Sequence, residues 1–197
     1  MADRGDEALR ALLDGNRRYV GKETVHPDRS EERRAALTGG QEPFATILGC
    51  SDSRVPAEIV FDQGLGDLFV VRTAGHVVDE AVLGTLEFGV SELGVPLIFV
   101  LGHERCGAVE VTNRAIDDPA DAEGSTRSLI EAIMPALVRA SNRPGDLLNN
   151  AVRANIEMTI ERLEASPVIA SALSQGKIKI AGGLYDLDTG LVEVTVR

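Results

Sequence analysis

The spacing of apolar positions along the chain changes near residue 40. Residues 6–20 place apolar and aromatic side chains at roughly helical spacing, which predicts an amphipathic helix; these side chains are Leu9, Leu12, Leu13 and Tyr19. A second, short helix is predicted over residues 31–37. Residues 1–40 are therefore interpreted as a helical arm that precedes a core of residues 41–197.

Beyond the arm, short apolar runs alternate with stretches of helical spacing. Five strands are predicted, at residues 44–49, 68–71, 95–101, 177–181 and 191–196. Helices are predicted between them at residues 81–93, 106–116, 127–140 and 146–164, with a polar loop over 117–126. Strands that alternate with helices and are apolar throughout favour a parallel sheet with both faces covered.

The last two predicted strands are joined by a short turn at residues 186–190, which indicates an antiparallel pair with the last strand at the sheet edge. The predicted fold is therefore α/β. Its central sheet has four mostly parallel strands plus an antiparallel edge strand, its helices lie on both faces, and residues 1–197 form a single domain with an N-terminal helical arm.

Charge limits the classes of partner. The chain has 20 basic and 31 acidic residues, a formal net charge of −11, which argues against a broad surface for nucleic acid or for an anionic membrane. Residues 1–7 lack the basic-then-apolar order of a signal peptide, and the longest apolar stretch, residues 95–101, is too short to span a bilayer. We expect a cytoplasmic protein with neither a nucleic-acid nor a membrane partner.

Potential metal ligands follow two of the predicted strands. The first strand runs through Ile-Leu-Gly into Cys50, and the third runs through Val-Leu-Gly into His103, with Cys106 three residues later. In open parallel sheets, functional groups collect at the carboxyl ends of the strands. If these two strands are neighbours, the three side chains converge at one edge of the sheet.

This set of side chains suits zinc, because thiolate and imidazole are its preferred ligands and three protein ligands leave a fourth position open for water. The position is open unless Asp52 fills it. Cys50 and Cys106 are the only cysteines, and two simpler interpretations are that they are small buried hydrophobes or a redox pair. Their shared setting after apolar strands favours a metal, and a separation of 56 residues is no Cys-x-x-Cys motif.

Asp52 and Arg54 lie two residues apart in the loop after the first strand. In an extended loop alternate residues point to one side, so this pair can form a hydrogen-bonded ion pair. An ordinary surface pair would contribute little. Beside zinc, the arginine would keep the aspartate ionised and oriented toward a zinc-bound hydroxide.

The motifs Cys50–Arg54 (C-S-D-S-R) and His103–Gly107 (H-E-R-C-G) resemble the two signatures of β-class carbonic anhydrases. Between them, residues 67–75 are similar to the family's strand segment, with Thr73 and His76 in place of two asparagines. The resemblance covers roughly residues 8–195 and is of the bacterial type.

The resemblance implies a lyase that hydrates carbon dioxide reversibly to bicarbonate and a proton, with one Zn²⁺ per chain and an Asp–Arg dyad that orients a zinc-hydroxide nucleophile. The expected zinc ligands are Cys50, His103 and Cys106. Gly107 is expected to offer its backbone N–H to bicarbonate, and Gln63 and Phe88 are weaker candidates for the substrate pocket.

The resemblance also implies two states of the site and a homodimer or a dimer of dimers. In the closed state only, Asp52 itself is the fourth zinc ligand; in the open state it pairs with Arg54, and high pH is expected to favour the open state. The apolar stripe of the arm is predicted to pack on a partner subunit, and packing on the chain's own sheet is the alternative.

Several functional interpretations compete. Carbonyl sulfide or carbon disulfide hydrolysis could use the same zinc site, and a zinc- or bicarbonate-binding regulator would need no turnover. His76 is a candidate proton shuttle by its ordinary pKa, although a structural role is the simpler interpretation. In some bacterial relatives, an arginine at the position of Arg72 helps to bind a second bicarbonate, together with a tryptophan. This chain has no tryptophan and has Ile47 in that neighbourhood, so we expect Arg72 to be structural.

Overall fold

The computed structural model describes residues 3–117 and 123–197, and its centre is a sheet of five strands in the order β2-β1-β3-β4-β5. The strands are β1 Ala45–Cys50, β2 Leu68–Thr73, β3 Leu97–His103, β4 Lys179–Tyr185 and β5 Val192–Val196. The first four run parallel, and β5 pairs antiparallel with β4 at the edge. The predicted α/β fold with an antiparallel edge strand is confirmed.

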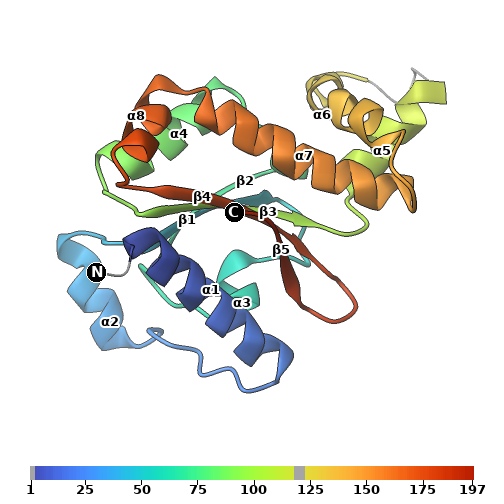
Figure 1. Cartoon of the computed structure of the whole chain (residues 1–197). Coiled ribbons are helices and arrows are strands. Elements are labelled where there is room, and N and C mark those ends of the chain that lie inside the picture. The colour runs from blue at the N-terminus through green and yellow to red at the C-terminus, as the bar shows by residue number, and fades with distance from the viewer. Residues whose placement is uncertain (1–2, 118–122) are drawn as a thin grey trace.

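Helices cover both faces of this sheet (Figure 1). One layer consists of α4 Glu80–Ser91, α5 Gly107–Asp117, α6 Thr126–Ala140, α7 Leu147–Glu164 and α8 Pro167–Ser174. The other side holds α1 Arg4–Val20, α2 Glu31–Ala36 and the single turn α3 Ala57–Val60. Short 3-10 turns lie at Leu37–Gly39 and Ala74–His76. None of the helices in the described ranges is both long and apolar enough to cross a membrane.

Two helices were not predicted from the sequence. α3 is four residues long, too short to show a period, and α8 begins just after α7, where Ser166 caps its first turn through Ile169 N. The polar loop predicted at 117–126 lies partly outside the described residues, since 118–122 are not among them.

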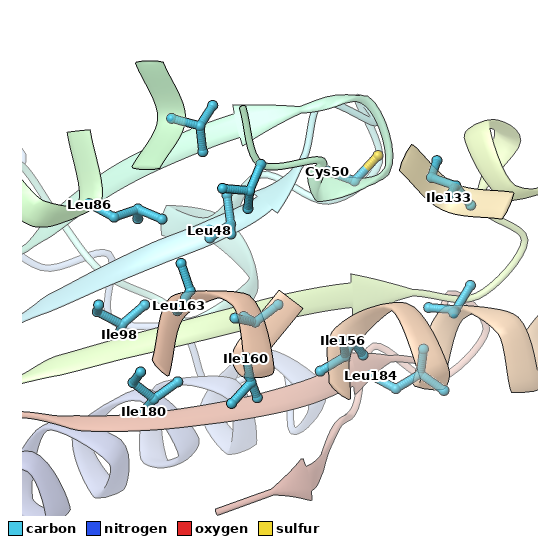
Figure 2. Close-up of a cluster of buried hydrophobic side chains, with 14 of the residues drawn as sticks. Leu48, Cys50, Leu86, Ile98, Ile133, Ile156, Ile160, Leu163, Ile180 and Leu184 are labelled. Carbon is cyan, nitrogen blue, oxygen red and sulfur yellow. The ribbon is translucent and has the colours of Figure 1, made fainter. Parts of the chain in front are cut away.

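Alternation along the strands sorts side chains between the two faces. Leu48 and Cys50 of β1 join the cluster beneath α4–α8, whereas Ile47 joins the cluster on the α1 side. Figure 2 shows the first cluster. Leu163 of α7 packs over the sheet near Ile98 of β3, and Cys50 follows Leu48 at the end of β1. The period of two along a strand therefore directs the Cys50 thiol toward the α4–α8 layer.

The helix α1 packs on the chain's own sheet. Leu9 and Leu12 are buried in the same cluster as Ile47 and Phe99. The prediction that this apolar stripe packs on a partner subunit is wrong, because the described chain already covers it. By contrast, α2 has no buried residue.

Candidate metal centre

The neighbouring strands β1 and β3 bring the predicted metal ligands together. They pair in register from Thr46↔Ile98 to Gly49↔Leu101. Cys50, the last residue of β1, and His103, the last residue of β3, therefore lie side by side. Cys106 directly precedes the first residue of α5. One ligand atom from each of the three side chains lies within 4.8 Å of the other two, and all three residues are buried. The predicted convergence is confirmed.

The tautomer of His103 is fixed by its neighbour. Its Nδ1 lies 2.8 Å from the backbone oxygen of Glu104, and since a carbonyl only accepts, Nδ1 carries the proton. The lone pair of Nε2 is therefore free, and this buried atom has no hydrogen-bond partner. A buried acceptor without a donor is costly unless something binds it, and a metal ion fits this requirement.

The two thiols differ in their affinity for protons. The adjacent side chains of Cys106 and His103, together with the backbone N–H of Gly75 at 3.3 Å, hold the pKa of the Cys50 thiol far below its usual range. The same contact to Cys50, together with burial, raises the pKa of the Cys106 thiol. Two adjacent thiolates repel each other, so without a cation the pair retains one proton. A divalent cation removes that conflict and allows both to ionise.

His103 responds to the same charge. Burial opposes its protonation, but the adjacent Cys50 sulfur and its negative charge outweigh burial and raise the pKa of the imidazole. The negative charge at Cys50 therefore attracts a positive charge into the cluster. A metal cation would supply that charge while leaving the imidazole neutral, as a ligand must be.

Asp52 and Arg54 form a bidentate ion pair beside the thiols. Arg54 Nε lies 2.9 Å from Asp52 Oδ1 and Nη2 lies 2.7 Å from Oδ2. These bonds hold the pKa of Asp52 well below its usual range. Asp52 Oδ2 lies 3.9 Å from the free Nε2 of His103, and Arg54 Nη2 also donates to the Arg105 carbonyl at 3.1 Å. Arg54 therefore links the two loops that contribute the candidate ligands.

Arg72 of β2 supports the first of these loops. Its Nε donates to the carbonyl of Cys50 at 2.8 Å and its Nη2 to the carbonyl of Asp52 at 2.6 Å. The expected structural role of Arg72 is supported by these contacts. The contacts themselves were not predicted from the sequence, because they join residues about 20 apart and leave no local pattern.

His76 is buried behind the cluster rather than exposed at its mouth. Asn155 Nδ2 donates both to the Gly75 carbonyl and to His76 Nε2, each at 2.9 Å. Burial lowers the pKa of His76 to about 4, so the ring is neutral near pH 7. These contacts favour the structural interpretation of His76 over that of a proton shuttle. Asn155, far away in the sequence, was not among the predicted residues.

The weaker pocket candidates lie elsewhere in the single chain. Gln63 is buried on the α1 side, where its amide donates to the Phe61 carbonyl at 2.8 Å. Phe88 is 47% exposed and stacks at 6.2 Å on Phe69, whose partner in β1 is four residues before Cys50, about 13 Å along the strand. The structure of one chain brings neither residue to the ligand cluster.

Gly107, by contrast, is next to the cluster. It follows Cys106 at the start of α5, and a Cβ added there would meet no atom within 4 Å. Packing does not require a glycine at this position. The open space agrees with the expectation that a ligand approaches the backbone N–H there.

Comparisons with known proteins agree with the geometry. Residues 45–192 match the sequence profile of the family described as carbonic anhydrase. A carbonic anhydrase of Mycolicibacterium smegmatis is 45% identical over 95% of this chain and 91% of its own length. Carbonic anhydrase 2 of Mycobacterium tuberculosis is likewise 45% identical, over 93% of this chain and 89% of its own length.

Solved structures extend the match to three dimensions. The β-carbonic anhydrase of Coccomyxa, solved in complex with acetazolamide, superposes with a TM-score of 0.75 at 26% identity, over 96% of this chain and 86% of that one. A match of this extent, joined to the cysteine–histidine cluster at the ends of β1 and β3, places the whole described fold in one family. The chain belongs to the carbonic anhydrases, and within them to the β class.

Proposed function

We propose that this protein hydrates carbon dioxide reversibly to bicarbonate and a proton, with one Zn²⁺ per chain held by Cys50, His103 and Cys106. The observation that carries the proposal is the buried, unpartnered Nε2 of His103 within 4.8 Å of two thiols. These donors are the types that zinc prefers, and three of them leave a position open. When bound, zinc lowers the pKa of a water molecule to about 7 and so supplies hydroxide at neutral pH.

Asp52 orients the nucleophile. Because Arg54 keeps the pKa of Asp52 low, this carboxylate stays ionised and would accept a hydrogen bond from the O–H of the hydroxide without removing its proton. This hydrogen bond would orient an oxygen lone pair toward the carbon of carbon dioxide. As the new C–O bond formed, one C=O electron pair would move onto oxygen. The backbone N–H of Gly107 donates to an oxygen of the bicarbonate formed. The proton released when water gives hydroxide passes to buffer.

The same site has a closed state in this proposal, with Asp52 as the fourth zinc ligand. A carboxylate is an acceptable ligand of zinc. Since hydroxide binds zinc better than water does, rising pH favours the open, active state. The short distance from Asp52 Oδ2 to His103 Nε2, 3.9 Å, supports this exchange.

The test combines metal content with turnover. Zinc is measured in the purified protein, and carbon dioxide hydration is followed by stopped flow with a pH indicator. We expect about one zinc per chain and rapid hydration. Carbonyl sulfide and carbon disulfide are assayed in parallel by sulfide release. Turnover of only these sulfur substrates would assign a different reaction, and zinc binding without turnover of any of the three would indicate a regulator.

A further inference from the structure

We propose that Arg72 is a positioning residue that holds the backbone around Ser51 and thereby keeps the Asp52 carboxylate off the metal. This inference rests on the proposed zinc site and concerns what keeps that site open. Arg72 donates a forked pair of hydrogen bonds to the carbonyls of Cys50 and Asp52, at 2.8 and 2.6 Å.

The β ladder ends where Arg72 begins to act. The last backbone bond between the two segments runs from Ser51 N to the Thr73 carbonyl at 2.9 Å. Beyond it, the loop that bears Asp52 diverges from β2. The Asp52 carbonyl accepts from Val55 N at 3.1 Å within the loop, and the Arg72 fork is what ties this loop back to β2. The rigid, planar fork of a guanidinium donates to both carbonyls from two separate nitrogens, a geometry that the single donor nitrogen of a lysine or an amide does not reproduce.

Asp52 needs such a restraint because it already lies near a ligand position. In a tetrahedral zinc site with bonds of about 2.0–2.1 Å, two ligand atoms are about 3.4 Å apart. The 3.9 Å between Asp52 Oδ2 and His103 Nε2 exceeds that separation by only about half an ångström. A small movement of the loop would therefore bring the carboxylate onto the metal.

The two arginines restrain different parts of Asp52. Arg54 holds the carboxylate, but its side chain is 51% exposed and its bonds compete with water. Arg72 is partly buried and holds the main chain on which that carboxylate is mounted. Without the fork, the main chain at Asp52 loses its tie to β2, and we expect Asp52 to reach the ligand cluster more easily even while Arg54 remains present.

Cobalt substitution reports directly on whether the fourth coordination position of the metal is open, without an activity assay. The protein is loaded with Co²⁺, its visible spectrum is recorded, and azide is titrated as the probe. We expect azide to change the wild-type spectrum. In Arg72→Lys, we expect one cobalt per chain and an apparent azide Kd raised at least about tenfold, since Asp52 then occupies the position. Arg72→Gln, whose amide reaches one carbonyl at most, should behave alike and serves if the lysine variant misfolds.

Two further variants make the test specific. Adding Asp52→Ala to Arg72→Lys removes the competing carboxylate and should restore the azide response. Arg33→Lys is the matched control, because Arg33 Nε also donates to a backbone carbonyl, that of Leu65 at 3.0 Å, outside the metal cluster. It should leave the azide titration unchanged.

Each other outcome overturns the proposal. A wild-type azide Kd in both Arg72 variants would show that the fork does not control the open position. A double variant that still ignores azide would show that Asp52 is not what blocks the metal, and a wild-type site that ignores azide would show that Arg72 does not hold it open. A wild-type protein that takes up no cobalt would contradict the proposed function itself, which separates that failure from a failure of Arg72 alone.

Discussion

At the scale of single residues, the cluster is defined by where its protons are. His103 has its proton on Nδ1, facing a carbonyl, and the two thiols differ in proton affinity because they lie side by side. The ligand types and their convergence were predictable, since both cysteines follow apolar strands in the sequence. The tautomer and the sharing of a proton were not, because they depend on contacts made only in the folded chain.

Removing a ligand should empty the site. In Cys106→Ala and in His103→Ala, we expect zinc to fall from about one per chain to near zero and hydration to be lost, because two ligands hold the ion poorly. Metal analysis after gel filtration measures this. His26→Ala is the control, since His26 is exposed on the other side of the sheet. Full zinc in either ligand variant would refute the assignment.

Arg54 should matter to turnover. In Arg54→Ala, Asp52 loses its partner and is free to approach the metal, so we expect hydration to fall about 10- to 100-fold. Stopped-flow rates at saturating carbon dioxide measure the change. Arg127→Ala is the matched control, because Arg127 pairs with Glu131 on the exposed face of α6. An unchanged rate in Arg54→Ala would rule out the proposed role of the pair.

His76 makes stability depend on pH. Its pKa is about 4 when folded and 6.5 when free, so the unfolded chain binds a proton first and stability falls as pH drops from 6.5 toward 4. At pH 5 this costs the wild type about 2 kcal/mol relative to pH 7. Urea unfolding at both pH values should show that His76→Asn lacks this loss. Equal losses in the two proteins would contradict the assignment.

At the scale of elements, periodicity predicted the strands and the longer helices to within a few residues. It failed where an element was a single turn, as in α3, and where a helix followed another after a short break, as in α8. The apolar stripe of α1 was predicted correctly, but its partner was not. A stripe shows that a helix face is buried, whereas only three-dimensional packing shows that the chain's own β3, β4 and α3 bury it.

Two glycines test how closely α1 packs. A Cβ at Gly15 would lie 1.8 Å from the Phe61 carbonyl oxygen, so Gly15→Ala should destabilise the protein by at least about 2 kcal/mol. Gly84 is the matched position, since it is exposed within α4 and a Cβ there meets nothing within 4 Å. Gly84→Ala should therefore stabilise by about 0.5–1 kcal/mol. Chemical denaturation measures both, and similar values would mean that α1 is not docked as described.

At the scale of the whole molecule, the β2 edge of the sheet is only partly covered. All six residues of β2 are only partly buried, and the exposed Phe88 lies beside Phe69 on the same edge. An edge strand that is largely apolar and only partly covered is a site for association. These features support the expected homodimer or dimer of dimers.

Light scattering should therefore give a mass of at least twice the 21.0 kDa of one chain. Phe88→Glu places a charge on this edge and should shift the protein toward monomers at micromolar concentration. Val138→Glu is the control, because Val138 is equally apolar and 66% exposed but lies on α6. An active wild-type monomer would contradict the prediction, and so would a Phe88→Glu protein of unchanged mass.

The placement of ligands on β1 and β3, with β2 and α4 between them in the sequence, affects how the protein is made. During synthesis, Cys50 leaves the ribosome 56 residues before Cys106. The intervening chain must place β2 at the far edge and fold α4 across the sheet before the two sulfurs meet. A nascent or prematurely ended chain thus presents isolated thiols and no metal-binding pocket. Under the proposed function, zinc is bound by all three ligands only after β1 and β3 have paired, so its uptake reports that the central strands have paired correctly.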